Sequence, residues 1–328
     1  MLQLLDYLLT LLELEIINKM NEIKIFSPAT IANVSCGFDV LGLALDTVGD
    51  EMIIRKVTKP GVAITKIIGQ DLPLETHKNV AGVAALALLA ETESDFGFEI
   101  EINKRIKPGS GIGSSAASSA GAVWAINELL DKPFSVLDLV RFAMEGERLA
   151  TGVAHADNVA PALFGGFTLV RSYDPLDIIS INTPEELYAT VIHPQIEVKT
   201  SDAREILKTT VPLKDAIKQW GNVGGLISGL YAEDYDLIGR SLEDYIIEPI
   251  RSILIPAFDA VKQQSIKAGA LGCGISGSGP SIFALSKGEE NAFKVVDAMK
   301  SVYKKVGIAY DIHISKINKQ GIKVLAKS

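Results

Sequence analysis

The sequence predicts an α+β fold with about two domains. Its 328 residues amount to roughly twice the usual length of one domain. Strand-like and helix-like patterns are mixed within each half of the chain, and several strand pairs look like hairpins, which favours α+β over a doubly wound parallel sheet. Hydrophobic residues make up 48% of the chain and charged residues 22%, which is ordinary globular usage and allows a core in each half.

A leucine-rich extension, residues 1–19, precedes the first convincing strand. Asp6, Glu13 and Glu15 interrupt its leucines. We expect an amphipathic helix rather than a secretory signal, because no basic segment precedes the leucines and no small-residue cleavage site follows them. A second methionine, Met20, lies just before the first strand, and we hypothesise that translation naturally begins there.

The first predicted domain comprises residues 20–171. Short β-branched or alternating runs predict its strands at Lys24–Ser27, Met52–Val57, Val62–Ile68, Phe96–Ile102 and Phe167–Arg171. Longer Ala- and Leu-rich stretches predict its helices at Asn79–Glu91, Ser114–Leu130 and Ser135–Ala150. We expect the first strand to end at Pro28 and the second and third strands to pair as a hairpin around Pro60 and Gly61.

The second predicted domain comprises residues 172–328 and starts at the turn cluster Ser172–Pro175. The same patterns predict strands at Ile178–Ile181, Leu187–His193, Ala270–Ile275, Ser281–Leu285 and Ala309–Ile314. Helices are predicted to begin at Ser201, Leu213, Asp234 and Ile255, with a further helix at Asn291–Lys304.

Composition excludes several classes of protein. The formal net charge is −8, and no basic block is present, which argues against a nucleic-acid binder. The longest purely apolar run, Val80–Ala90, is far shorter than the ~20 residues that a membrane span needs. Cys36 and Cys273 cannot build a disulfide framework, which indicates a reducing, cytoplasmic location. The four histidines are scattered along the chain, so no metal-ligand cluster is visible.

The most informative segment is Lys107–Ser119, with the sequence KPGSGIGSSAASS. It follows a strand and leads directly into an Ala-rich helix. Its glycines allow a tight turn, and the unpaired amides and dipole at the start of a helix favour an anion, so a polyphosphate is the natural ligand. A flexible Gly/Ser connector is the alternative, but such linkers do not usually begin a helix.

Two better-known glycine motifs do not apply. A Walker A loop requires Gly-Lys-Ser/Thr at its end, whereas Gly113 is followed by Ser114. A literal G-x-G-x-x-G does occur within GCGISGSGP at Gly272–Gly277, but a helix precedes it and a strand follows it. The dinucleotide fingerprint needs the reverse order, so this match is accidental.

Three motifs in order resemble those of the GHMP kinases. They are SPATIANVSCGFDVLG near the start, KPGSGIGSSAASS in the middle and GISGSGPSIFAL near the end. Within this superfamily the chain is most similar to the homoserine kinase family. The blocks GERLATGVAHADNVAPALFGGFTLV, TSDAREIL and IIEPIRSILIP carry this closer resemblance, which spans nearly all of Ile23–His313.

The resemblance implies a fold, a reaction and an assembly. The N-terminal domain would be like ribosomal protein S5 domain 2, and the C-terminal domain would be ferredoxin-like. The implied reaction is transfer of phosphate from ATP to the hydroxyl of L-homoserine, a step toward threonine, by a homodimer. Another small-alcohol kinase of the mevalonate or shikimate type is an alternative, and so is a non-catalytic ATP-binding regulator of the same fold.

The resemblance also implies the residues that bind ATP and Mg²⁺. Ser115 and Glu147 match the metal positions, although a solvated helix carboxylate would be the ordinary interpretation of Glu147 taken alone. Asn79 and Val80 match positions near the adenine. The ATP-binding positions are Pro108, Gly109, Ser110, Gly111, Ile112, Gly113, Ser114, Ser115, Ala116, Ala117, Ser118 and Asn79.

The substrate positions follow in the same way. Arg204 and Arg251 match the positions that bind the carboxylate, where guanidinium groups can form paired hydrogen bonds; surface salt bridges are the alternative. Asp39 is the expected partner of the ammonium group. Taken alone, His155 would be a structural histidine. The substrate-binding positions are Asn33, Asp39, His155, Asn158, Arg204 and Arg251.

The proton acceptor stays open between neighbouring residues. Asn158 is expected to orient the hydroxyl with no strong protein base, which a loose phosphoryl-transfer transition state tolerates. Asp157 is the alternative base. The predicted catalytic residues are Asn158, Asp157 and Glu147.

Overall fold

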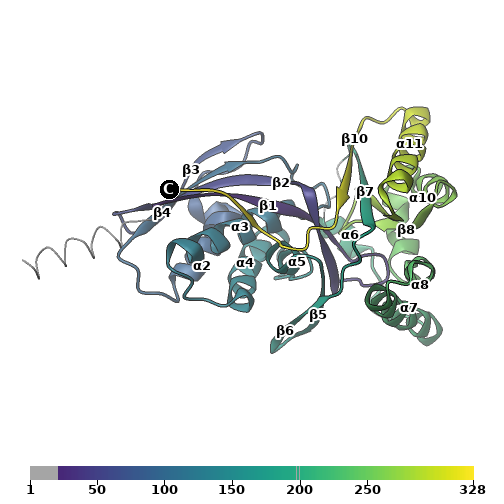
Figure 1. The fold of residues 1–328 in the computed structure, drawn as a ribbon, viewed down its shortest axis with the longest axis horizontal. Coiled ribbons are helices and arrows are strands. Elements are labelled where there is room, and N and C mark those ends of the chain that lie inside the picture. The colour runs from purple at the N-terminus through teal and green to yellow at the C-terminus, as the bar shows by residue number, and fades with distance from the viewer. Residues whose placement is uncertain (1–20, 197, 199) are drawn as a thin grey trace, which may run out of the picture.

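The computed structural model describes residues 21–328 except 197 and 199 (Figure 1). A larger sheet with helices on one face forms one end of the molecule, and a smaller sheet with its own helices forms the other. The predicted helix of the leucine-rich extension lies outside the described residues. In the part that is described, no helix is both long and apolar enough to span a membrane.

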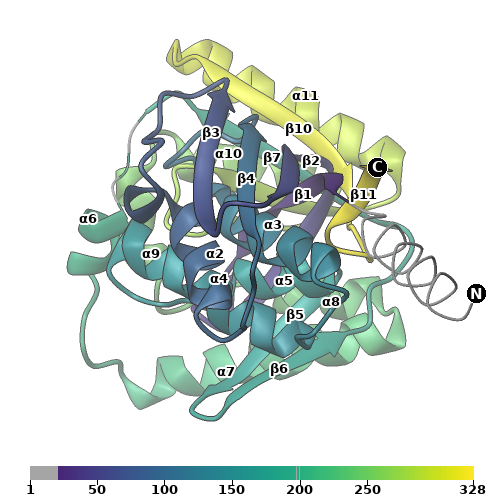
Figure 2. The ribbon, with the colours of Figure 1, turned by 90° about the vertical axis from the view of Figure 1, so that its left-hand side faces the viewer.

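The larger sheet has seven strands. Five of them lie side by side in the order β11 (Lys323–Lys327), β1 (Glu22–Ala32), β2 (Leu41–Val57), β4 (Gly97–Asn103) and β3 (Gly61–Ile68). The hairpin of β5 (Phe167–Tyr173) and β6 (Leu176–Ile181) joins this sheet through the first residues of β2. Figure 2 shows the C-terminal strand β11 returning beside β1 at one edge.

Two predictions about these strands are wrong. Strand β1 does not end at Pro28 but runs through it to Ala32, because the ladder with β2 changes register between Pro28 and Thr30 and needs no amide from proline there. Strands β2 and β3 do not form a hairpin, since β4 lies between them. The link from β2 to β3 passes over the start of β4, where a Cβ on Gly97 would lie 1.9 Å from the Lys59 carbonyl oxygen.

Helices cover one face of this sheet (Figure 1). Helix α3 packs on β1 and β2 through alanines and serines that are almost all buried. The capping box at Ser135 confirms the predicted start of its neighbour α4. The helices of this layer are η1 (Thr76–Lys78), α2 (Val80–Leu89), α3 (Ser114–Leu129), α4 (Val136–Thr151) and α5 (Val159–Phe164).

The smaller sheet contains β7 (Leu187–Pro194), β8 (Ala270–Ile275), β9 (Ile282–Lys287) and β10 (Tyr310–Lys316). Their spatial order is β10-β7-β9-β8, all antiparallel. Numbered along the chain, this order is 4-1-3-2, which confirms the expected ferredoxin-like domain. The helices of this half are α6 (Thr200–Glu205), α7 (Leu213–Ala232), α8 (Tyr235–Ser241), α9 (Glu248–Arg251), η2 (Ser252–Leu254), α10 (Phe258–Lys267) and α11 (Glu289–Val306).

The two halves share a hydrophobic core. Leu43 and Phe167 from the larger sheet pack in one cluster with Leu187, Phe283 and Leu285 from the smaller one. The division between residues 171 and 172 falls within the β5–β6 hairpin, both of whose strands belong to the larger sheet. The segments that connect the two sheets therefore lie at the junction between the larger and the smaller sheet.

Candidate active site

A cavity of about 370 Å³ lies at this junction. The loop of residues 108–113, here called the glycine loop, lines it together with the first turn of α3 and with Glu147 of α4. The loop of residues 33–39, here called the Asn33 loop, lines another part. Arg204 of α6, Arg251 of α9 and the segment 155–158 complete the wall.

The glycine loop joins β4 to α3 in a shape that few side chains allow. Gly109, Gly111 and Gly113 all have positive φ angles, of 73°, 82° and 67°. At Gly111 a Cβ would also lie 2.6 Å from the Gly279 carbonyl oxygen, and Ser276 Oγ donates a hydrogen bond of 2.7 Å to the Gly111 carbonyl. The third glycine-rich motif therefore packs directly against this loop and fixes its shape.

The predicted ATP positions divide into two groups. Pro108, Gly109, Gly111, Gly113, Ser114, Ser115, Ser118 and Asn79 line the cavity, whereas Ser110, Ile112, Ala116 and Ala117 lie buried behind it. The side chain of Asn79 is occupied elsewhere. Its Oδ1 caps α2 by accepting from Ala81 N at 3.0 Å, and its Nδ2 donates to the Pro73 carbonyl at 2.8 Å.

A buried lysine stands beside the start of α3. Lys104 Nζ forms an ion pair with Asp50 and donates hydrogen bonds to the Ser114 carbonyl at 2.6 Å and to Ser118 Oγ at 3.0 Å. Both side chains are almost completely buried, and burial lowers the pKa of Lys104 below its usual range, against the opposing charge of Asp50. No local sequence pattern indicates this pair, because Lys104 precedes the glycine loop and Asp50 is distant in the chain.

Glu147 lies in the cavity wall with an unsatisfied carboxylate oxygen. The residue is 5% exposed, and its Oε1 atom has no hydrogen-bond partner. Burial raises the pKa of Glu147 to about 7, against the lowering effects of a hydrogen bond from Ser115 and of the Lys104 charge. Gly146 allows this approach, since a Cβ there would lie 2.1 Å from Ser119 Oγ of α3. Glu147 is thus not a solvated helix carboxylate.

The Ser115–Glu147 pair suits a hard cation. Magnesium prefers oxygen ligands and usually binds through one or two carboxylates together with substrate phosphates. An unpartnered, buried carboxylate oxygen beside a serine hydroxyl at the glycine loop fits this chemistry. Among the described residues of 21–328, no group of three or more His, Cys, Asp or Glu side chains is placed to hold a metal ion.

Asp157 and Asn158 both line the cavity, but their environments differ. Burial, followed by the negative charges of Asp39 and Glu147, raises the pKa of Asp157 to about 7. Asn158 accepts a hydrogen bond of 2.7 Å from Thr30 Oγ1 through its Oδ1 atom. Thr30 is fully buried in β1 and orients the Asn158 amide, a role that the sequence did not indicate.

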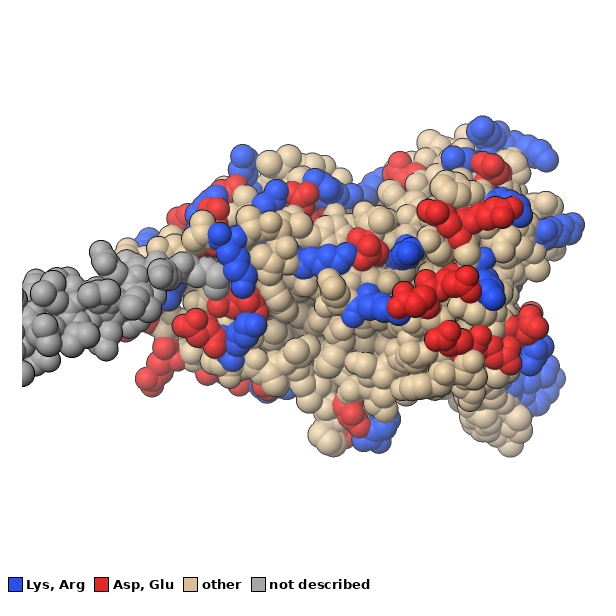
Figure 3. Space-filling model, in the orientation of Figure 1, with Lys and Arg blue, Asp and Glu red and all other residues tan. Residues whose placement is uncertain are grey.

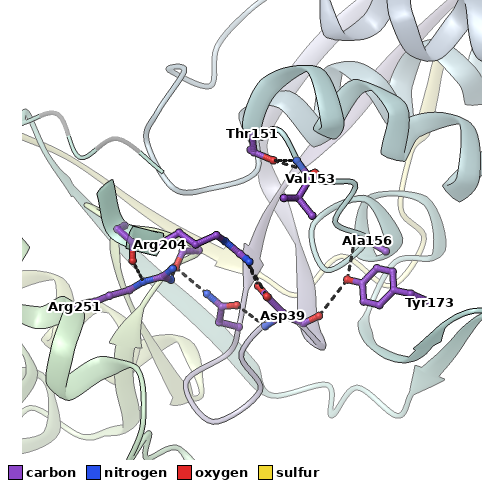
Figure 4. Close-up of polar contacts among 10 residues, drawn as sticks. Asp39, Thr151, Val153, Ala156, Tyr173, Arg204 and Arg251 are labelled. Atoms are coloured by element: carbon purple, nitrogen blue, oxygen red, sulfur yellow. Dashed lines mark hydrogen bonds and ion pairs between the residues drawn. The ribbon is translucent and has the colours of Figure 1, made fainter. Parts of the chain in front are cut away.

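Opposite charges meet at the other end of the cavity (Figure 4). Arg204 Nη2 donates to Asp39 Oδ1 at 3.0 Å and to Asp39 Oδ2 at 2.9 Å. Arg251 is 3% exposed, and its Nε donates to the Ala203 carbonyl at 2.7 Å. Both guanidinium groups lie over the ring of Phe38, at 5.7 Å and 4.9 Å from its centroid. Both arginines therefore line the cavity, where Arg204 forms its ion pair with Asp39.

The remaining predicted substrate residues also reach this end. Asn33 uses both polar atoms of its side chain, because Oδ1 accepts from Asp39 N at 3.0 Å and Nδ2 donates to the Gly277 carbonyl at 2.8 Å. His155 keeps a buried Nε2 atom without a partner. Burial lowers the pKa of His155, while the nearby Asp39 charge opposes this shift. A neutral imidazole is thus available to a ligand.

Comparison with known protein families agrees with the expected fold. The family model described as the GHMP kinases N terminal domain matches residues 79–166, and the GHMP kinases C terminal model matches residues 226–305. These two regions contain the glycine loop and most of the ferredoxin-like half. The predicted α+β GHMP kinase fold is confirmed.

Proteins similar to this chain are named homoserine kinase in distant organisms. The homoserine kinase of Chlorobium phaeobacteroides is 48% identical over 321 residues, which cover 93% of this chain and 100% of that protein. The homoserine kinase of Methanococcus maripaludis is 42% identical over 88% of this chain and 97% of its own length.

Solved structures give the same result. The crystal structure of homoserine kinase from Cytophaga hutchinsonii is 55% identical and superposes with a TM-score of 0.89, covering 93% of this chain and 98% of that chain. The mevalonate kinase of L. major, at 16% identity and a TM-score of 0.68, shares the fold. This chain belongs to the homoserine kinase family of the GHMP kinases.

Proposed function

We propose that this chain transfers the γ-phosphoryl group of ATP to the side-chain hydroxyl of L-homoserine, giving ADP and O-phospho-L-homoserine for threonine synthesis. One observation carries the proposal beyond family membership. A single cavity joins an anion-binding glycine loop to a cluster of two arginines and one aspartate, which suits a nucleotide and a zwitterionic amino acid held together.

The glycine loop would hold the triphosphate. Its amides and the first turn of α3 present donors and a partial positive charge. Lys104 adds a buried positive charge behind this turn. Mg²⁺ would be held by Glu147 and Ser115 together with the phosphates, and it would neutralise charge on the transferred group.

The amino acid would bind by exchanging ion pairs. Its carboxylate would take Arg204 and Arg251, and its ammonium group would take Asp39, so each charged group keeps a partner when the Arg204–Asp39 pair opens. Neutral His155 and Asn33 complete the wall around the ligand. A substrate with only one of these charges would open the Arg204–Asp39 pair and leave Asp39 or an arginine unpaired, which disfavours substrates that lack either the carboxylate or the ammonium group.

The hydroxyl oxygen attacks the γ-phosphorus while the bond to the β,γ-bridging oxygen breaks. We assign Asn158 to orienting this hydroxyl, because Thr30 fixes its amide. With a loose transition state, the hydroxyl proton can pass to an oxygen of the transferred group. Asp157 is the alternative acceptor, since its pKa of about 7 suits a general base.

A homodimer in the cytoplasm is part of the same proposal. Two free, buried cysteines agree with a reducing compartment. One face of α7 supports self-association, because Leu213, Ile217, Trp220 and Tyr231 are between 51% and 67% exposed on a single stripe. Figure 3 shows a largely uncharged surface over α7 at the lower right, with charged groups at its margins.

A substrate panel tests the reaction. ADP release is measured with ATP and Mg²⁺ in the presence of L-homoserine, mevalonate, shikimate or no acceptor. The proposal expects release with L-homoserine at least 100-fold above the other acceptors. Equal or greater release with mevalonate or shikimate would overturn the substrate assignment, and ATP hydrolysis indifferent to every acceptor would overturn the kinase assignment.

A further inference from the structure

The Asn33 loop has an unusual backbone. Asn33, Val34, Ser35 and Asp39 all have positive φ angles, of 71°, 39°, 61° and 60°. Residues with a side chain rarely adopt this region, and such strain persists only where surrounding contacts hold it. The loop also carries Asp39 and Phe38 into the cavity. Contacts that fix its shape therefore fix one wall of the amino acid site.

One such contact comes from Tyr173 at the end of β5. Its hydroxyl donates to the Asp39 carbonyl at 3.2 Å and accepts from Ala156 N at 3.3 Å. Figure 4 shows the Tyr173 hydroxyl between these two segments. Burial raises the pKa of Tyr173 to about 12, so the hydroxyl keeps its proton at neutral pH. Tyr173 thus ties the Asn33 loop to the segment that carries His155 and Asp157.

A second contact comes from Gln219 on the buried face of α7. Its Nε2 donates to the Cys36 carbonyl and to Asp244 Oδ1, both at 2.9 Å, and its Oε1 accepts from Tyr245 N at 2.8 Å. Asp244 in turn accepts from the amides of Ile246, Ile247 and Glu248, which lead into the short helix of Arg251. Gln219 thus ties the same loop to the turn that carries the buried arginine.

We propose that Tyr173 and Gln219 are positioning residues that clamp the strained Asn33 loop in the shape that receives the amino acid. Neither residue lines the cavity. Each acts through a backbone carbonyl of the loop, one at each side, and links it to a different part of the same wall. The proposal rests on the proposed function for the identity of the amino acid, but the clamp itself rests on these hydrogen bonds.

Two variants test the clamps. Tyr173→Phe removes only the hydroxyl, and Gln219→Met removes the amide at nearly constant length. Each loses two or three hydrogen bonds, so the KM for L-homoserine should rise about tenfold. The KM for ATP should stay within about twofold, because the glycine loop is untouched. Tyr303→Phe is the matched control, since it loses a similar bond, from its hydroxyl to the Pro256 carbonyl at 3.1 Å, in the hydrophobic core of the smaller-sheet half.

A double variant tests the route of the effect. Tyr173 acts through Asp39. Tyr173→Phe should therefore raise the KM for L-homoserine far less in an Asp39→Asn background than in the wild-type protein. Full additivity of the two changes would overturn the positioning role. So would equal rises in both KM values, or unchanged KM values with a lowered melting temperature.

Hydrogen exchange separates this proposal from the proposed function. The amides of Asn33, Gly37, Asp39 and Leu41 are hydrogen-bonded within or beside the loop. Both clamp variants should exchange these amides at least fivefold faster than the wild type and the Tyr303→Phe control, with no substrate added. Unchanged exchange would overturn the clamps even if the chain is an active homoserine kinase. If exchange is faster but the chain does not phosphorylate L-homoserine, the clamps are supported and only the proposed substrate is wrong.

Discussion

Arg204 and Asp39 form an ion pair with each other, with both carboxylate oxygens of Asp39 within 3.0 Å of Arg204 Nη2. The resemblance assigns these groups to opposite charges of one substrate. They lie 165 positions apart in the chain, on α6 and on the Asn33 loop. Arg204 and Asp39 therefore neutralise each other, and a zwitterion can replace this pair with two new ones.

Removing the arginine should weaken amino acid binding selectively. Arg204→Leu loses a charge-assisted contact with the carboxylate, so the KM for L-homoserine should rise by about 10- to 100-fold. The KM for ATP should change less than twofold in the same steady-state assay. Arg171→Leu is the control, because Arg171 pairs with Asp177 on the exposed β5–β6 hairpin. Parallel rises in both KM values for Arg204→Leu would contradict the assignment.

The glycine loop should tolerate a methyl group at one glycine better than at another. Both Gly109 and Gly111 have positive φ, but only at Gly111 would a Cβ collide with the Gly279 carbonyl. Gly111→Ala should therefore raise the KM for ATP at least tenfold more than Gly109→Ala does. Equal effects of the two alanines would show that the contact with the third motif is irrelevant to nucleotide binding.

Glu147→Gln should have opposite effects on activity and on stability. Turnover should fall at least 100-fold, because the variant loses the proposed metal carboxylate. Without Mg²⁺ at pH 8, the free energy of unfolding should rise by on the order of 2 kcal/mol, because the folded state no longer buries a carboxylate whose pKa is raised to about 7.

The pKa shift of Glu147 fixes the sign of the pH dependence of this stability difference between the variant and the wild type. The folded pKa of Glu147 lies above its unfolded value, so the free-energy cost of burying the wild-type carboxylate is absent below about pH 4.5, grows as the pH rises toward 7 and is constant above it. Urea unfolding at several pH values measures it. Glu145→Gln, an exposed neighbour on α4, should change neither activity nor stability. A Glu147→Gln enzyme with wild-type turnover would exclude the metal role.

The pH–rate profile of Asp157→Asn decides between the two proton routes. If Asn158 orients the hydroxyl and no protein base is needed, the variant should keep kcat within about tenfold of the wild type at every pH. A base at Asp157 would instead make wild-type kcat fall below pH 7, as the carboxyl becomes protonated. The variant would then lose that acid limb and 10² to 10⁴ in kcat.

The α7 face should carry the dimer contact. Sedimentation of the wild type should give twice the chain mass of 35.2 kDa, and Trp220→Asp should give the monomer, since a charge would enter an apolar interface. Phe293→Asp is the control, because Phe293 is 56% exposed on α11 instead. A dimer that survives Trp220→Asp would place the contact on another surface.

Local patterns predicted most elements, since periodicity and caps depend on near neighbours. Ser135 and the Ala-rich stretch after Gly113 specify helix starts that the structure confirms. Strand pairing depends on distant residues, and nothing near Pro60 indicates that β4 would insert between β2 and β3. Likewise, Pro28 reads locally as a strand end, although a register shift accommodates it.

The site was predicted unevenly for the same reason. Motif residues such as Arg204 and Glu147 could be placed through the family resemblance, and the structure brings them to one cavity. Supporting residues belong to no motif and act through long-range contacts. Lys104 reaches Asp50 across 54 positions, and Thr30 reaches Asn158 across 128. No local pattern distinguishes such a lysine or threonine from an ordinary strand residue.

A crystal structure with Mg²⁺, a non-hydrolysable ATP analogue and L-homoserine would show whether nucleotide and amino acid share the one cavity. We expect the triphosphate against residues 108–115, the metal at Glu147, and the amino acid carboxylate between Arg204 and Arg251 with its hydroxyl toward the γ-phosphate. A nucleotide bound elsewhere, or an amino acid that leaves the Arg204–Asp39 pair intact, would contradict it.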